Sequence, residues 1–260
     1  MTAAAIQAGW PTVSALVRRS ANELLRVPGA AIPGVLAPTI FFLGLTSVFG
    51  ELTNLRGFTT DSYASFLIPV SLLQGAGFTG AATGVNLARD IELGWFDRLL
   101  ASPSPRPALL AGLVFSASVR ALVPAVVLLS VAFAVGANWP GLPGLLIAFF
   151  GVMAMGTVAA LYGCWLALKF RTQGAAPLMQ AGMFVAILFT TSYAPKALLQ
   201  PWLQTVSEIN PVTQILEMVR QGFVTGGVTW GETWPGIVAL AGLVTIFAYL
   251  ALRGMQHMAD

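Results

Sequence analysis

Apolar stretches of about 20 residues recur along this chain, and they constrain its fold more than any other feature. They lie at residues 32–50, 65–87, 121–137, 142–168, 175–193 and 234–252. A helix needs ~20 such residues to cross the ~30 Å hydrocarbon core of a bilayer. Only 9% of the residues are charged, whereas soluble domains carry roughly 25%. We therefore predict an all-α polytopic membrane protein with a bundle of transmembrane helices, one for each stretch.

A basic amphipathic segment at residues 10–27 precedes the first span. Its apolar residues share one helical stripe, and Arg18, Arg19 and Arg26 lie opposite them. A helix of this kind lies in the membrane surface, with its arginines towards the headgroups. We favour this interfacial helix over an ordinary solvated helix because a span follows directly.

Lysine and arginine are divided unevenly between the two sides of the predicted bundle, which sets its orientation. With the N-terminus inside, the cytoplasmic side holds Arg18, Arg19, Arg26, Arg89, Arg98, Arg106, Lys169, Arg171 and Arg253, and the outer side holds Arg56, Lys196 and Arg220. Both termini and the connection at residues 88–108 are therefore predicted to be cytoplasmic. The connection at residues 194–233 is predicted to form an outer, re-entrant-like helical hairpin.

The cytoplasmic connection at residues 88–108 concentrates charge between nearly uncharged spans. Gly94 can end or bend the incoming helix, and the prolines from Pro103 onward stop the next one. A short amphipathic helix from Trp95 is predicted between them. Such a helix suits a groove on a partner protein, and packing beneath the bundle or on the membrane surface is an equally open alternative. Its apolar residues are Trp95, Phe96, Leu99 and Leu100, and its charges are Asp97 and Arg98.

Three charged residues fall in or beside apolar surroundings. Arg120 precedes the predicted third span, and we favour an anchor at the cytoplasmic interface over a place on a pathway, because a long side chain can reach back to the headgroups. Glu217 and Arg220 are spaced i, i+3 on a predicted helix after the turn at Asn210 and Pro211. We interpret that pair as structural, shaping the outer gate.

The chain lacks the residues of an ATPase. A phosphate-binding loop needs G-x-x-x-x-G-K-[ST], and neither Lys169 nor Lys196 follows glycine or precedes serine or threonine. One cysteine, Cys164, and one histidine, His257, leave no disulfide and no metal cluster. We therefore predict no enzyme activity, no metal and no cofactor on this chain.

Two patches resemble type-2 ABC exporter permeases, in particular the daunorubicin-resistance-like branch of drug and antibiotic exporters. The first reads Arg89-Asp90-x-Glu92-x-Gly94-x-x-Asp97-Arg98-Leu99-Leu100-x-Ser102-Pro103-x-x-Arg106. The second comprises Pro201-Trp202-Leu203, Asn210-Pro211-Val212-Thr213, Glu217 and Arg220. Where the family often has Gly-Thr after the acidic turn, this chain has Gly94-Trp95.

The resemblance implies a permease in a bacterial plasma membrane that dimerises with a second copy or a related permease. Each half would dock on a separate ATPase subunit, which would hold ATP and Mg, and the two halves would move a drug, antibiotic or lipid by alternating access. Gly94 would be the turn of the coupling loop, with an apolar wedge of Trp95, Phe96, Leu99 and Leu100. The rim would be polar, with Asp90, Glu92, Asp97 and Arg98, followed by Pro103 and Arg106. Pro201, Trp202, Asn210, Pro211, Glu217 and Arg220 would shape the outer hairpin.

Other functions remain open on the sequence. Export of a lipid-linked polysaccharide is a rival substrate within the same class. An ion-coupled secondary transporter should carry acidic or histidine residues within its spans, and these spans have essentially none. A membrane protein with a structural or assembly role is a third alternative.

Overall fold

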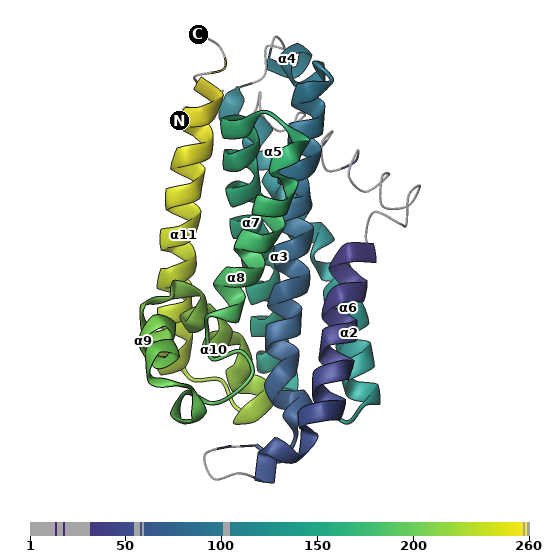
Figure 1. Cartoon of the computed structure of the whole chain (residues 1–260), viewed down its shortest axis with the longest axis vertical. Helices are drawn as coiled ribbons and strands as arrows, with labels where there is room; N and C mark the ends of the chain where they lie inside the picture. Colours follow the sequence, from purple (N-terminus) through teal and green to yellow (C-terminus); the bar gives the residue numbers. More distant parts are fainter. Residues whose placement is uncertain are drawn as a thin grey trace.

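The chain is described by a computed structural model that covers Ser14, Arg18 and residues 32–54, 58, 60–100, 105–256 and 258. Within these residues every regular element is a helix, and the long helices lie side by side along one axis (Figure 1). The α-helices are α2 (Ile32–Phe49), α3 (Tyr63–Glu92), α4 (Trp95–Leu100), α5 (Arg106–Arg120), α6 (Leu122–Ala134), α7 (Gly141–Phe170), α8 (Ala176–Leu188), α9 (Pro201–Ile209), α10 (Pro211–Val224) and α11 (Trp230–Gln256). The 3₁₀ helices are η2 (Gly50–Asn54), η3 (Gln173–Ala175) and η4 (Lys196–Leu198). Of the predicted interfacial segment at 10–27, the described residues include Ser14 and Arg18, both helical.

Five helical segments of the described chain are long and apolar enough to cross a membrane. They are Gly34–Asn54, Tyr63–Glu92, Arg106–Ala134, Gly141–Phe170 and Trp230–Gln256. Each overlaps one of the predicted spans, so the all-helical membrane fold is confirmed. The remaining prediction, at 175–193, corresponds to the shorter apolar helix Gln173–Leu188. Its 3 residues in η3 and 13 in α8 rise only about 24 Å, less than the ~30 Å of a hydrocarbon core.

Helix α8 ends early because the polar residues after it compete for its carbonyl groups. The hydroxyl groups of Thr190 and Ser192 both donate to the carbonyl oxygen of Ile187, at 2.7 and 2.6 Å. Side-chain bonds of this kind offer the backbone an alternative to the helix. The prediction that a helix continues to residue 193 is therefore wrong, and the chain turns at this point towards α9 and α10.

The third span begins earlier than predicted and is interrupted at Ala121. It starts at Arg106 rather than at residue 121, and it runs through α5 and α6 to Ala134. Ala121 separates the two helices, three residues before Pro124. Proline has no amide donor and its ring crowds the carbonyl group four residues earlier, here that of Arg120, so the break between α5 and α6 falls where proline places it.

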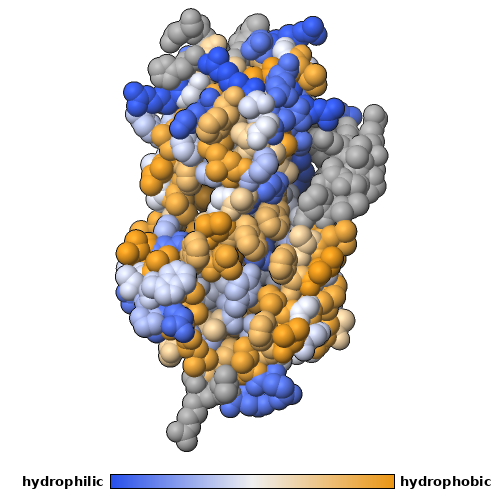
Figure 2. Space-filling view, in the orientation of Figure 1, coloured by the Kyte–Doolittle hydropathy of each residue, from blue (hydrophilic) through white to orange (hydrophobic). Residues whose placement is uncertain are grey.

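Helix α3 is the centre of the bundle. Within the most apolar part of each helix, 83% of the residues of α3 are buried, against 17% in α11 and 11% in α2. Helix α3 contacts α2, α5, α6, α7, α8 and α10. In Figure 2 polar residues gather at the end that holds α4 and at the tip of the opposite end, with hydrophobic residues between them. This distribution fits a bundle whose sides face lipid and whose ends face water.

Candidate functional site

The turn between α3 and α4 projects from one end of the bundle (Figure 1). Helix α3 continues through the predicted polar residues Asp90 and Glu92 before it ends. The amide groups of Leu93 and Gly94 donate to the carbonyl oxygens of Arg89 and Ile91, each at 3.0 Å. Gly94 has a φ of +68°, a left-handed conformation that glycine adopts without a steric penalty. Gly94 is therefore the turn residue, as the sequence predicts.

Helix α4 has one face against the bundle and one face outward. The side chain of Phe96 is fully buried, and Leu99 is partly buried against the same core. Leu93 and Trp95 keep 69% and 36% of their surface exposed, and Asp97 and Arg98 are exposed beside them. The predicted wedge is thus divided: Phe96 is an anchor inside the protein, because only one face of so short a helix can point outward.

The other predicted coupling residues are spread around this turn. Asp90 is half-buried on α3, and Arg106 is half-buried at the start of α5. Pro103 lies outside the described residues, as does the side chain of Leu100. The exposed Leu93, which belongs to the outward face, is absent from the set predicted from the sequence. Its position immediately before the turn glycine is the signal that identifies it.

Glu92 joins this turn to the connection between α7 and α8. Its carboxylate accepts hydrogen bonds from the Thr172 hydroxyl at 2.7 Å and from the Gln173 amide at 2.9 Å. The Gln173 side chain donates a third bond at 2.6 Å. Glu92 therefore holds two connections at the same end of the bundle together, and these contacts occupy a carboxylate that the sequence assigns to the polar rim.

Arg120 lies inside the bundle, away from the α4 end. As the last residue of the 15-residue α5, it lies about 21 Å along the helix from Arg106. Its Nη2 atom donates to the hydroxyl of Thr83 on α3, at 2.7 Å. The favoured prediction is an anchor at the membrane interface, next to a span at 121–137. The apolar helical segment instead starts at Arg106, so Arg120 lies about halfway along it.

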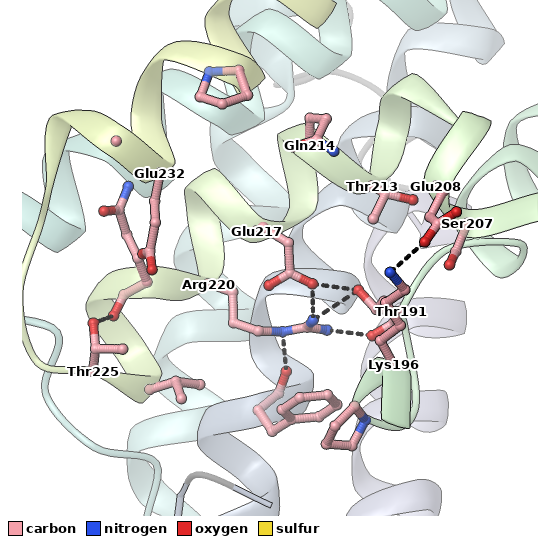
Figure 3. Close-up of a pocket in the computed structure, with 16 residues that line it drawn as sticks. Thr191, Lys196, Ser207, Glu208, Thr213, Gln214, Glu217, Arg220, Thr225 and Glu232 are labelled. Carbon is pink, nitrogen blue, oxygen red and sulfur yellow. Dashed lines mark hydrogen bonds and ion pairs between the residues drawn. The ribbon is translucent and has the colours of Figure 1, made fainter. Parts of the chain in front are cut away.

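At the opposite end, Arg220 of α10 holds together three separate parts of the chain (Figure 3). Only 4% of its surface is exposed. Its guanidinium donates to the Glu217 carboxylate at 2.8 Å, to the carbonyl oxygens of Thr191 and Ser192 at 2.8 and 3.3 Å, and to that of Phe66 at 3.4 Å. It also lies 4.0 Å from the centre of the Phe66 ring. The Thr191 hydroxyl completes the network by contacting both Glu217 and Arg220.

This network is possible because the backbone after α8 is not helical. Carbonyl groups outside a helix need other donors when they lie within a membrane protein, and Arg220 supplies two of them, those of Thr191 and Ser192. The sequence predicts the Glu217–Arg220 pair but misses its partners Thr191, Ser192 and Phe66. A polar triplet at the end of an apolar run, residues 190–192, is the signal that could have indicated them.

Asn210 connects the hairpin to the end of α8. Its side-chain amide donates to the carbonyl oxygens of Ala186 and Phe189, at 2.7 and 3.0 Å. Its side-chain oxygen accepts from the Val212 amide at 3.0 Å, capping the first turn of α10. The predicted residues Pro201 and Pro211 begin α9 and α10, where proline loses no hydrogen bond. Trp202 is exposed and packs edge-to-face with Phe189.

A cavity of about 620 Å³ opens beside the Arg220 network (Figure 3). Its lining includes carboxylates from three helices, Glu208 of α9, Glu217 of α10 and Glu232 of α11, among apolar side chains. Lys196 forms an ion pair with Glu208 at its rim. The described residues contain no group of three histidine, cysteine, aspartate or glutamate side chains that could hold a metal ion.

Comparisons with known proteins identify relatives across nearly the whole chain. A family model described as "ABC-2 type transporter" matches residues 11–224. The chain is 25% identical over 234 residues to "Daunorubicin resistance ABC transporter permease protein DrrB1" of Streptomyces coeruleorubidus, covering 87% of this chain and 79% of that protein. It is 27% identical over 244 residues to "Probable doxorubicin resistance ABC transporter permease protein DrrC" of Mycobacterium tuberculosis, covering 90% and 82%. It is also 26% identical over 192 residues to "Probable multidrug ABC transporter permease YbhR" of Escherichia coli, covering 69% and 50%.

Proposed function

Since the chain belongs to the ABC-2 type transporter family, we propose that it moves a lipophilic small molecule outward, powered by a separate ATPase subunit. Membership makes it a multi-pass membrane protein and a permease subunit of an ABC transporter, with no enzyme activity expected of it alone. ATP and Mg belong to the partner subunit in this proposal. The drug, antibiotic or lipid class of the substrate follows from the names of the relatives, which refer to drug resistance.

The outward face of α4 carries this proposal. Phe96 fixes the helix to the bundle core, while Leu93, Trp95, Asp97 and Arg98 face away from it. An apolar side chain ringed by charge is the usual composition of the central contact in a protein interface. We assign this face as the contact with the ATPase. The buried side of α4 packs against the bundle, so a movement of the ATPase would be transmitted through α4 to α3.

The transport step in this proposal is alternating access between two permease copies. The α4 end and both termini face the cytoplasm of a bacterial cell, and the α9–α10 hairpin faces outside. The network of Arg220, Glu217 and Thr191 ties this hairpin to α3 and to the end of α8. Movement of α3 at the α4 end would therefore reach the hairpin, which acts as the outer gate.

Replacing Trp95 with alanine tests the assignment of α4. We expect the Kd of the detergent-solubilised permease for its ATPase subunit to rise about 30-fold, because a central tryptophan in an interface contributes roughly 2 kcal/mol. The measurement is biolayer interferometry with the purified subunits. Trp139→Ala is the matched control, since Trp139 is an exposed tryptophan in the connection between α6 and α7. Equal affinities for Trp95→Ala and the wild-type protein would refute the assignment.

A further inference from the structure

A groove between α7 and α11 lies at the α4 end of the bundle, next to the α7–α8 connection that Glu92 contacts. Its volume is about 390 Å³, and its lining consists of Trp165, Leu168, Lys169, Arg171, Leu250, Arg253 and Gly254. Helices α7 and α11 pack along each other and both end here (Figure 1). The groove therefore lies where the apolar sides of two long helices meet the polar end of the bundle.

Its polar side consists of cations that form no ion pair with a carboxylate in the described part of the chain. Lys169, Arg171 and Arg253 are exposed, and no aspartate or glutamate of the described chain lies within ion-pair distance of them. The Lys169 ammonium instead lies 5.6 Å from the ring centres of Trp165 and Phe170. Three positive charges thus converge on one groove from two helices, which makes it complementary to an anion.

One of these cations, Arg171, has a backbone conformation that is unfavourable for a residue other than glycine. Arg171 has a φ of +56°, the only positive φ of a non-glycine residue in the described part of the chain. It ends α7, and its amide donates to the carbonyl oxygen of Ala167 at 2.8 Å. Glycine is the usual residue in this left-handed position. The turn that ends α7 does not require a side chain at this position, so the arginine is not explained by the helix end, and it places a cation at the groove.

Its other side is apolar and open along the helices. Leu168 of α7 and Leu250 of α11 face the groove beside Trp165, whose ring lies 6.0 Å from that of Phe247. Gly254 contributes no side chain, and a Cβ atom there would lie 3.2 Å from the Cβ atom of Leu168. Gly254 therefore lets α7 and α11 approach closely at this point, and the room for an acyl chain is the groove itself, beside Trp165 and Leu250.

We propose that this groove binds an anionic phospholipid, with the phosphate on Lys169, Arg171 and Arg253 and an acyl chain along Trp165 and Leu250. Basic pockets between membrane helices on the cytoplasmic side are suited to such headgroups. The apolar side of the groove distinguishes a phospholipid from a free phosphate ion, because a free ion would contact only the cations. Lipid binding to this groove can be measured on the permease alone, without the transported substrate or the ATPase.

Native mass spectrometry of the purified permease with phosphatidylglycerol and phosphatidylcholine tests the proposal. We expect the wild-type protein to retain phosphatidylglycerol in preference to phosphatidylcholine. We expect Arg253→Gln to lower that retention about fivefold, because each cation near a membrane surface adds this much to the affinity for an anionic lipid. Arg89→Gln is the matched control, because Arg89 is an exposed arginine at the same end on α3. Leu250→Gln, which leaves the charges intact, is expected to lower retention as well.

Three results would overturn the proposal. Equal losses in Arg253→Gln and Arg89→Gln would assign lipid binding to the general positive charge of this end. Displacement of phosphatidylglycerol by millimolar inorganic phosphate, with no effect of Leu250→Gln, would indicate a site for the free ion. Unchanged lipid retention in Arg253→Gln, with weaker binding of the ATPase subunit, would make the groove a protein contact.

Discussion

Replacing Gly84 with alanine is expected to prevent the bundle from forming its native core. A Cβ atom at this position would lie 2.3 Å from the carbonyl carbon of Gly163 and 2.4 Å from its Cα atom. These are backbone atoms of α7, so no side-chain rotation relieves the clash. Small residues allow membrane helices to approach closely where packing, rather than the hydrophobic effect, holds them together. We expect a loss of about 3 kcal/mol or more.

Thermal unfolding of the purified protein in detergent measures this loss. Gly242→Ala is the matched control, because Gly242 also lies within a long helix and, beyond its own helix backbone, no atom of the described chain lies within 4 Å of a Cβ atom built there. Alanine favours a helix by about 1 kcal/mol over glycine, so this control should melt no lower than the wild-type protein. A Gly84→Ala protein that melts with the control would show that α3 and α7 do not approach as described.

Replacing Arg220 with methionine is expected to give the second large effect. The substitution removes the side-chain donor from the carbonyl groups of Thr191 and Ser192 and removes the cation that pairs with the Glu217 carboxylate. Removing one partner of a buried charge network destabilises a protein by roughly 3–5 kcal/mol. We expect Arg220→Met to lower the melting temperature strongly and Arg220→Lys to recover only part of the loss, because lysine cannot reproduce the planar fork of donors.

Lys196→Met supplies the contrast for this experiment. Lys196 pairs with Glu208 at the same end of the bundle, and both side chains are exposed. Exposed ion pairs contribute at most about 1 kcal/mol, so Lys196→Met should unfold close to the wild-type temperature. Similar melting temperatures for Arg220→Met and Lys196→Met would contradict the central role of Arg220 in holding the hairpin to α3.

The hydropathy of the chain was sufficient to predict the bundle and the place of most spans. Long apolar runs have few alternatives in a bilayer, because a helix satisfies its own backbone. The predicted ends of the helices are wrong where polar residues determine them. Arg106 begins a span despite its charge, because an arginine at a helix end reaches water, and α8 ends at residue 188 because Thr190 and Ser192 bind its last turn.

In each of the two candidate sites, the sequence predicts some residues and misses others. Gly94 and the short helix after it follow from local rules, since a glycine turn and a later proline bound the segment. Local rules do not predict which face of α4 points inward, because the burial of Phe96 depends on helices distant in the sequence. The partners of Arg220 are likewise remote: Phe66 lies 154 positions away along the chain, and no local pattern connects them.

The most direct test of the proposed function is co-reconstitution of this permease with its ATPase subunit in liposomes. The quantity to measure is ATP hydrolysis together with movement of a candidate drug, each with and without the permease. We expect the drug to stimulate hydrolysis only when the permease is present, and we expect Trp95→Ala to abolish stimulation and transport together. Hydrolysis that is indifferent to the permease, or transport that continues without ATP, would contradict an ATP-driven exporter coupled through α4.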